Sequence, residues 1–343
     1  PSLLKTGNPP FVIAEMSCNH GGKLSIAKEI IKQAALAGAS AIKLQTFQPK
    51  EMTLDVDNKS FRINDSNSLW YKRKLFDLYK EAHTPWEWHE ELFKFANENN
   101  IICFSTPSDT KAVDFLEDLN CPCYKVASFE NNNPYLLKKI ALTKKPIIVS
   151  TGLTSLENIS KTVNILRENG NKNYALLVCV SSYPAKTESY NLHRISTLKK
   201  IFGCSVGISD HTLNNVASIT ATSLGAQIIE KHFIHDKKYI TLDSEFSADP
   251  QDLKLLIDQV KSAKASLGNG RFDIDREEQK SSKYKRSIFC SKDIALGEKI
   301  TVENISIIRP GNGLSPFEYS NILGLRAIKK IKKGTPLSWD LIK

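Results

Sequence analysis

Two segments of the sequence each end in a histidine that follows a short apolar run. They are residues 205–211 (Ser-Val-Gly-Ile-Ser-Asp-His) and 228–233 (Ile-Ile-Glu-Lys-His-Phe), and both are typical of strands. Residues 214–224 predict a helix between them, which would make the two strands parallel neighbours. Either histidine alone is more often a structural residue. Together, His211 and His232 would meet at one edge of a sheet, and the pair predicts a metal site.

Two lysines also fall within predicted strands. Lys43 stands between Ile42 and Leu44, and Lys125 occupies a comparable position. A buried ammonium group is costly unless it meets an anion, and a single lysine of this kind usually forms an ion pair or reaches solvent. Two of them beside several hydroxyl groups predict a cradle for phosphate and carboxylate, although a strand-end serine can equally cap the next helix. The hydroxyl groups are those of Thr106, Ser128, Ser150 and Ser209.

The elements that carry these residues alternate along the chain. Strands followed by helices over about 267 residues predict a (β/α)8 TIM barrel, in which the strand C-terminal ends form the active site. A doubly wound sheet is the alternative, but no glycine-rich nucleotide fingerprint follows any strand. The predicted strands are residues 11–15, 41–46, 101–106, 124–128, 146–151, 175–181, 205–211 and 228–233. The predicted helices are residues 24–37, 86–99, 155–169, 214–224 and 250–267.

The pattern changes after the last helix and predicts two domains. Residues 1–267 form the barrel, with an insertion at 47–84 whose tryptophans predict packing against the barrel. Residues 268–283 are polar and predict a linker. Residues 284–343 contain short apolar runs broken by glycines and predict a small β-rich domain.

Charge and composition narrow the class of protein. The net charge is +10, but the basic residues are dispersed among acidic ones, so an anionic small substrate is favoured over nucleic acid. No apolar run is long enough to predict a membrane helix, and no signal peptide precedes residue 11. Seven cysteines, an odd number, indicate a reducing cytoplasm, and Cys121 to Cys123 lacks the spacing of a zinc or redox motif and predicts a loop.

Several short motifs resemble the sialic acid synthase family in order and spacing, over essentially the whole chain. The last 60 residues, with Arg-Pro-Gly-Asn-Gly at 309–313, resemble its antifreeze-like (SAF) domain. Residues 69–79, 84–89 and 243–247 resemble the branch that makes pseudaminic acid. The barrel motifs are Ala-Glu-Met-Ser-Cys-Asn-His at 14–20, Ile-Lys-Leu-Gln-Thr at 42–46, Ser-Thr-Pro at 105–107, Tyr-Lys-Val-Ala-Ser-Phe-Glu at 124–130, Ser-Thr-Gly at 150–152, Ser-Asp-His-Thr at 209–212 and Glu-Lys-His-Phe at 230–233.

The resemblance implies condensation of phosphoenolpyruvate with an open-chain amino sugar. A divalent ion, manganese or magnesium, would be held by His211 and His232. Glu15, Glu230 and Asp243 would transfer a proton or orient the sugar. Phosphoenolpyruvate would be bound by Lys43, Thr106, Lys125, Ser128, Ser150 and Ser209, and the sugar by Gln45, Glu130, Ser181 and Tyr183.

The resemblance also implies a homodimer in which each SAF domain covers the partner's barrel and presents Arg309 to its substrate. Two residues depart from the family pattern: Cys18 replaces a smaller residue, and Ser181 stands where some relatives carry Asn or Thr. Synthesis of N-acetylneuraminic or legionaminic acid remains an alternative, as does a non-catalytic antifreeze-like binding protein. Retention of the acids, lysines and histidines argues against the latter.

Overall fold

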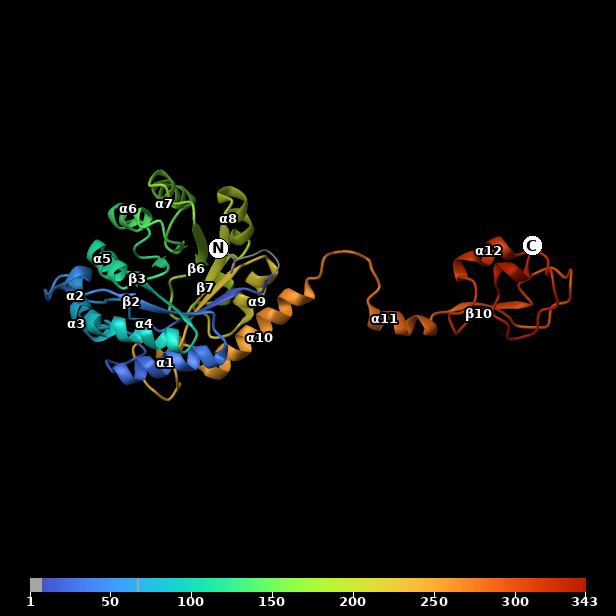
Figure 1. Cartoon of the computed structure of the whole chain (residues 1–343), viewed down its shortest axis with the longest axis horizontal. Helices are drawn as coiled ribbons and strands as arrows, with labels where there is room; N and C mark the ends of the chain where they lie inside the picture. The colour runs from blue at the N-terminus through green and yellow to red at the C-terminus, as the bar shows by residue number, and fades with distance from the viewer. Residues whose placement is uncertain (1–7, 67) are drawn as a thin grey trace. The chain divides into compact units, whose positions relative to one another are not determined.

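The computed structural model describes residues 8–66 and 68–343 and contains a closed barrel of eight parallel strands. Each strand pairs with the next along the chain, and β8 pairs with β1 to close the barrel. The helices surround the strands (Figure 1). The predicted TIM barrel is confirmed, because a doubly wound sheet would have open edges. The strands are β1 (Phe11–Glu15), β2 (Ala41–Thr46), β3 (Ile102–Pro107), β4 (Tyr124–Val126), β5 (Ile147–Ser150), β6 (Tyr174–Cys179), β7 (Ser205–Asp210) and β8 (Ile228–His232).

The helices form where apolar residues recur with a helical period between capping residues. α1 (Leu24–Ala37) buries one apolar face and ends at Gly38, whose φ of 89° is the left-handed conformation that glycine adopts readily. The Ser155 hydroxyl caps α7 (Leu156–Glu168) by accepting a hydrogen bond from the backbone N–H of Asn158. The other barrel helices are α4 (His89–Glu98), α5 (Thr110–Asp118), α6 (Pro134–Leu142), α8 (Arg194–Phe202), α9 (Val216–Ser223) and α10 (Pro250–Ser266).

Three of these helices, α5, α6 and α8, are not among the predicted elements. Each has nine residues, so its apolar period is short. Start signals for two of them are nevertheless present in the sequence. The side chains of Asp109 and Asn133 accept backbone N–H groups at the starts of α5 and α6, and Pro134 occupies the first turn of α6.

Alternation of side chains gives each barrel strand an outer and an inner face. In β2, Ile42 and Leu44 belong to the core, whereas Lys43 and Gln45 line the interior of the barrel near its C-terminal end. Gly207 in β7 has a packing role, because a Cβ atom there would lie 2.2 Å from the backbone oxygen of Ile228. Polar residues are therefore collected where the strands end.

The insertion between β2 and α4 packs against the barrel, as predicted. It contains α2 (Pro49–Met52) and α3 (Leu75–Ala82). The indole N–H of Trp70 donates to the carbonyl oxygen of Leu242 at 3.2 Å, which attaches the insertion to the loop after β8. Just beyond the insertion, the Trp86 ring stacks on Phe115 with centroids 4.4 Å apart.

Residues 269–343 form a second compact unit with its own apolar core. Its strands β9 (Ser287–Cys290) and β10 (Ile305–Ile308) pair antiparallel, and isolated bridges extend the β structure. The prediction of a small β-rich domain is confirmed. Short helices are also present: α11 (Arg276–Ser281), within the predicted linker, and α12 (Tyr319–Ile322).

In residues 8–66 and 68–343, the structure has no helix of the length and apolarity needed to span a bilayer. All seven cysteines are free thiols. Cys121 and Cys123 lie in a loop, as predicted, and the Cys121 thiol donates to the carbonyl oxygen of Cys123.

A buried histidine at the start of α4 makes the barrel sensitive to acid. His89 is fully buried, with Nδ1 3.1 Å from the carbonyl oxygen of Pro85 and Nε2 2.8 Å from the Thr46 hydroxyl. Burial lowers its pKa from 6.5 to about 4. Between those values the unfolded chain binds a proton that the folded chain does not, so the free energy of unfolding decreases as the pH falls from 6.5 towards 4.

We expect this histidine to contribute up to about 1.4 kcal/mol per pH unit within that window. Urea denaturation followed by circular dichroism, at several pH values between 7 and 4.5, measures the slope. His89→Gln keeps a hydrogen-bonding side chain that does not titrate and should have a smaller slope. Equal slopes in the two proteins would contradict the assignment.

Candidate active site

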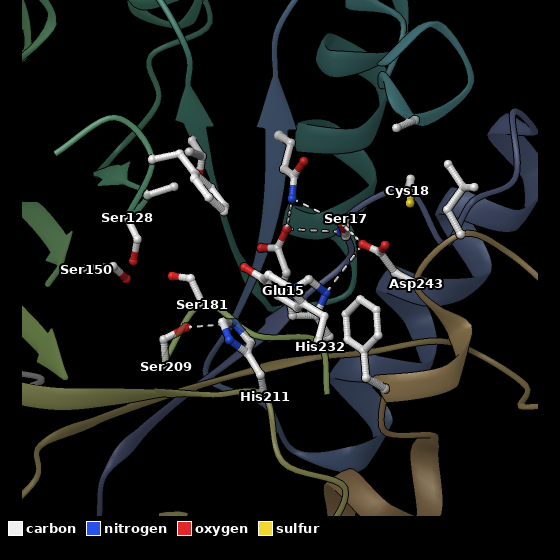
Figure 2. A pocket seen from close by; sticks show the side chains of 18 of the residues that line it. Glu15, Ser17, Cys18, Ser128, Ser150, Ser181, Ser209, His211, His232 and Asp243 are labelled. Carbon is white, nitrogen blue, oxygen red and sulfur yellow. Dashed lines mark hydrogen bonds and ion pairs between the residues drawn. The ribbon is translucent and has the colours of Figure 1, made fainter. Parts of the chain in front are cut away.

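A cavity of about 570 Å³ lies at the C-terminal ends of the barrel strands (Figure 2). Active sites of TIM barrels occupy this end, because the loops after the strands converge there. Residues of the insertion and of the loops after β6 and β8 complete the wall. All the site residues predicted in the barrel line it: Glu15, Lys43, Gln45, Thr106, Lys125, Ser128, Glu130, Ser150, Ser181, Tyr183, Ser209, His211, Glu230, His232 and Asp243.

Strand register brings together residues that are distant in the sequence. Glu15 of β1 is paired in register with Lys43 of β2 and with His232 of β8. Ser209 of β7 is likewise paired with Glu230 of β8. Since register sets the height of a residue and alternation sets its face, these five side chains enter the cavity from adjacent strands.

Two carboxylates and two lysines form a buried charge network in the cavity. Lys43 pairs with Glu15, and the Nζ atoms of Lys43 and Lys125 lie 3.8 Å and 3.7 Å from Glu230. Burial alone would raise the pKa of Glu230, but the charges of Lys125 and Lys43 outweigh it and lower that pKa to about 2. Burial raises the pKa of Glu15 despite the neighbouring Lys43. One carboxyl group is therefore suited to carry a proton while the other stays ionised.

Hydroxyl groups surround the lysines and complete a cradle. Lys43 Nζ donates to the Thr106 hydroxyl at 3.1 Å, and Lys125 Nζ donates to that of Ser150 at 2.7 Å. Ser150 therefore faces a lysine and does not cap a helix. The Ser128 hydroxyl is buried with no hydrogen-bond partner in the described residues. A Cβ atom on Gly152 would lie 2.6 Å from it, so the absence of a side chain there keeps the cradle open.

The two histidines adjoin each other on the other side of the charge network. Their ring centroids are 5.3 Å apart. His211 Nδ1 lies 2.7 Å from the carbonyl oxygen of Val180, which can only accept, so Nδ1 carries the proton and Nε2, which lies 3.3 Å from the Ser209 hydroxyl, has the lone pair. Burial lowers the pKa of His211 to about 4 and that of His232 well below its usual value. Both rings are therefore neutral at pH 7, the form in which imidazole binds metal.

The described side chains around the two histidines offer few further donors for the predicted divalent ion. Nδ1 of His232 is buried without a hydrogen-bond partner among the described residues and lies 3.7 Å from an Asp243 oxygen. Across residues 8–66 and 68–343, no three His, Cys, Asp or Glu side chains are grouped closely enough to hold an ion by themselves. Two neutral imidazoles fit a divalent ion whose other positions are filled by water and substrate.

A third carboxylate, Asp243, enters the cavity from the loop after β8. It accepts a hydrogen bond of 2.5 Å from the Ser17 hydroxyl, and burial raises its pKa to about 6. Cys18 lies beside it (Figure 2), and burial together with the charge of Asp243 raises the pKa of that thiol well above its usual value. Cys18 is thus a buried, protonated thiol in the cavity wall.

The insertion contributes an apolar wall. Its side chains face a cavity whose polar groups come mainly from the strand ends. Tyr183 packs over both His211 and His232 and against Phe246, with ring centroids 4.4 Å from His211 and 5.1 Å from Phe246. The apolar insertion residues in the wall are Phe47, Met52, Ile63, Leu69, Trp70, Leu75, Leu78, Tyr79 and Ala82, and the polar residues Asp65 and Ser68 of the same segment also line it.

One predicted residue does not belong to this cavity. Arg309 lies exposed in the second unit, between β10 and Pro310. Conversely, Ser17 and Phe246 line the cavity but are not among the predicted site residues. Ser17 falls within the motif at 14–20, so its position was a signal, although its contact with Asp243 depends on a residue 226 positions away. Phe246 likewise falls within the motif at 243–247.

The arrangement has the parts needed for a reaction between an anion and a carbonyl compound. Paired lysines and hydroxyls can neutralise a phosphate and a carboxylate. Two neutral imidazoles can hold a Lewis acid, and carboxyl groups with different pKa values can accept and donate protons. The apolar wall suits a substrate that carries methyl groups.

Comparisons with known proteins match both structural units of the chain to known families. Residues 30–272 match the NeuB family, and residues 285–343 match the SAF domain. The pseudaminic acid synthase of Campylobacter jejuni subsp. jejuni serotype O:2 is 43% identical over 97% of this chain and 96% of its own length. That of Helicobacter pylori is 42% identical over 97% of both chains. The N-acetylneuraminic acid synthetase of Leptospira borgpetersenii, solved with citrate, is 32% identical with a TM-score of 0.71, over 81% of this chain and 92% of its own.

Proposed function

The chain belongs to the NeuB family, and on that basis we propose that it condenses phosphoenolpyruvate with 2,4-diacetamido-2,4,6-trideoxy-altrose to give pseudaminic acid and phosphate. The enzyme is a transferase that forms a carbon–carbon bond. Pseudaminic acid synthases at 42–43% identity over almost the full chain support this substrate. Their N-acetylneuraminic and legionaminic counterparts define the alternative sugars.

The observation that carries the proposal is the anion cradle. Lys43 and Lys125 are buried beside two carboxylates. The Ser128 hydroxyl has no hydrogen-bond partner in the described residues. A phosphate and a carboxylate would satisfy all three groups, and phosphoenolpyruvate has both. The lining hydroxyls Thr106, Ser150 and Ser209 complete its binding site.

The sugar occupies the remaining space between the charge network and the apolar wall. Its two acetamido methyl groups and its C6 methyl group match the aromatic and aliphatic side chains of the insertion. Its hydroxyl and amide groups are bound by Gln45, Glu130, Ser181 and Tyr183, which line the same cavity.

His211 and His232 would hold a divalent ion, Mn²⁺ or Mg²⁺, through ring nitrogens. Bound there, the ion would supply Lewis acidity at the sugar aldehyde. Lys43 and Lys125 orient phosphoenolpyruvate so that its C3 attacks the aldehyde carbon and the C2=C3 electron pair forms the new bond. The aldehyde oxygen becomes a hydroxyl group and gains a proton, for which Glu15 and Asp243, whose pKa values are raised by burial, are the candidate donors.

Water then adds to C2, where positive charge develops, and phosphate leaves from the resulting adduct as the keto group forms. Ionised Glu230 lies beside both lysines and stabilises that charge. Glu15, whose pKa is raised by burial, is suited to carry the proton that water loses.

The active unit is a homodimer, and Arg309 of one chain reaches the substrate in the partner's barrel. The arginine is exposed, it follows β10, and it precedes a loop with two glycines. Gly313 there has no room for a side chain, because a Cβ atom would lie 2.4 Å from the Ile288 backbone oxygen.

The seven free thiols support a reducing compartment, the cytoplasm.

Mass spectrometry of the reaction product tests the function directly. Purified protein with phosphoenolpyruvate, Mn²⁺ and the diacetamido altrose sugar should yield pseudaminic acid and one phosphate per sugar. N-acetylmannosamine and the legionaminic precursor should react more slowly. Excess chelator should stop turnover, and added Mn²⁺ should restore it. Faster turnover of another sugar would replace the substrate, and full activity in excess chelator would remove the metal from the mechanism.

Lys125→Met tests the cradle. The change keeps the length of the side chain but removes the charge, so we expect phosphoenolpyruvate binding to weaken by about 2–5 kcal/mol. The sugar KM should change little. Lys138→Met, on the exposed face of α6, is the matched control and should bind phosphoenolpyruvate normally. Unchanged affinity in Lys125→Met, measured by calorimetry, would show that this lysine has a structural role.

Mixed dimers test the role of Arg309. Arg309→Ala and His211→Ala should each be inactive in a pure dimer. After subunit exchange, one site of the mixed dimer has an intact barrel and an intact arginine, so part of the activity should return. Native mass spectrometry verifies that mixed dimers form. If they form without any recovery of activity, Arg309 does not act on the partner's barrel.

A further inference from the structure

Ser17, directly beyond β1, has an unusual backbone conformation in the wall of the cavity. Its φ is 48°, in the left-handed region, and it is buried. A side chain in this region costs free energy that glycine would avoid. Such conformations persist where surrounding contacts compensate for them, and they are frequent at functional sites.

The compensating contacts come from three cavity residues: Glu15, Gln45 and Asp243. The Ser17 hydroxyl donates to Asp243 at 2.5 Å and accepts from Gln45 Nε2 at 3.0 Å. The Ser17 backbone N–H donates to Glu15 Oε1 at 3.1 Å, and Gln45 Nε2 donates to the same oxygen at 2.9 Å. Ser17 thereby joins a carboxylate of β1 to a carboxylate of the loop after β8 (Figure 2).

The hydroxyl matters most for Asp243. This carboxylate is buried, and the ionisable groups near it include Glu15, the Cys18 thiol and His232, whose Nδ1 lies 3.7 Å away. The loop that carries Asp243 is anchored by its backbone, through the bond from Trp70 to Leu242. The Ser17 hydroxyl fixes the carboxylate group itself, because a hydrogen bond from a hydroxyl to an ionised oxygen is short and strong.

We propose that Ser17 is a positioning residue, which holds Asp243 and Gln45 in the orientation that the sugar requires. The inference rests on the proposed function. Ser17 acts through these two side chains, and its backbone conformation aims the hydroxyl between them. Glycine would suit the backbone better, so the benefit of serine at this position lies in its hydroxyl group.

The position in the barrel identifies which substrate is affected. The Ser17 hydroxyl bonds to Asp243 and Gln45, whereas Lys125, Ser128 and Ser150 of the phosphoenolpyruvate site belong to β4, β5 and the loop between them, across the barrel from β1 and β8. Lys43 of β2 and Ser209 of β7 are nearer, but the hydrogen bonds of the Ser17 hydroxyl in the described residues go to Asp243 and Gln45. Figure 2 shows Ser128 and Ser150 across the cavity from Ser17 and Asp243. Loss of the hydroxyl should therefore alter use of the sugar more than binding of phosphoenolpyruvate.

Two substitutions separate the hydroxyl from the backbone. Ser17→Gly removes the hydroxyl, relieves the left-handed strain and keeps the N–H that binds Glu15. Ser17→Ala removes the hydroxyl but retains the strain. We expect both to lower kcat/KM for the sugar about 10- to 100-fold, the loss associated with a hydrogen bond to a charged group. The KM for phosphoenolpyruvate should stay within about twofold of wild type in both.

Stability should move differently from activity. Ser17→Gly should have a Tm equal to or above that of Ser17→Ala, although both variants should have a reduced kcat/KM for the sugar. Asn120→Gly is the matched control. Asn120 has a φ of 55° and is exposed in the turn between α5 and β4, at the opposite end of the barrel. That change should leave kcat and both KM values unaltered.

The outcomes distinguish this inference from the proposed function. Wild-type turnover with the diacetamido sugar must be present first, and its absence would overturn the proposed function. If wild type turns over and Ser17→Gly is equally active, the positioning role is wrong. Equal losses for sugar and phosphoenolpyruvate, in step with a lower Tm, would show that Ser17 merely supports the fold. A selective loss for the sugar in a protein of undiminished Tm supports the proposal.

Discussion

The structure depends on the burial of two lysine charges inside a closed barrel. Lys43 and Lys125 are at most 4% exposed, and an ammonium group in such surroundings must have anionic neighbours. Glu15 and Glu230 supply them within the protein, at distances set by strand register. Because two carboxylates share two lysines, an incoming phosphate or carboxylate can compete for the same ammonium groups, and the site is prepared for an anion before one arrives.

Division of labour within the cavity follows from chain topology. The strand ends carry charged and hydroxyl groups in fixed register, which suits the part of the reaction that every substrate shares. The insertion and the loop after β8 are less constrained by the barrel, and they supply aromatic and aliphatic side chains. A rigid polar base with a variable apolar wall allows a barrel to change sugar specificity without disturbing its chemistry.

The left-handed Ser17 lies where these two parts meet. Its N–H contacts a strand residue, Glu15, and its hydroxyl contacts a loop residue, Asp243. A short polar side chain at this junction can hydrogen-bond to a carboxylate on a longer loop and hold it in a fixed position relative to the strands. The left-handed backbone conformation of Ser17 costs free energy, but it places the hydroxyl where it can orient the side chains of the site.

Residue types and their periodicity were enough to predict the barrel and most of its polar interior. Parallel strands are buried on both faces, so a lysine such as Lys43 or a histidine such as His232 stands out against its apolar neighbours, and strand ends converge in any TIM barrel. The short helices α5, α6 and α8 were harder to predict, since nine residues contain little periodicity and tertiary packing supplies most of their stability.

The neighbours of each ionisable side chain, by contrast, depend on the tertiary structure. The pKa of Glu15 rises while that of Glu230 falls, and both are glutamates at strand ends in the sequence. The difference arises from burial and from distances to lysines on other strands, which no local pattern encodes. The left-handed φ of Ser17 and its hydrogen bond to Asp243, 226 positions away, likewise arise only when the barrel closes. Residue types and periodicity act over a few positions, whereas electrostatic environment and side-chain pairing depend on elements that only folding brings together.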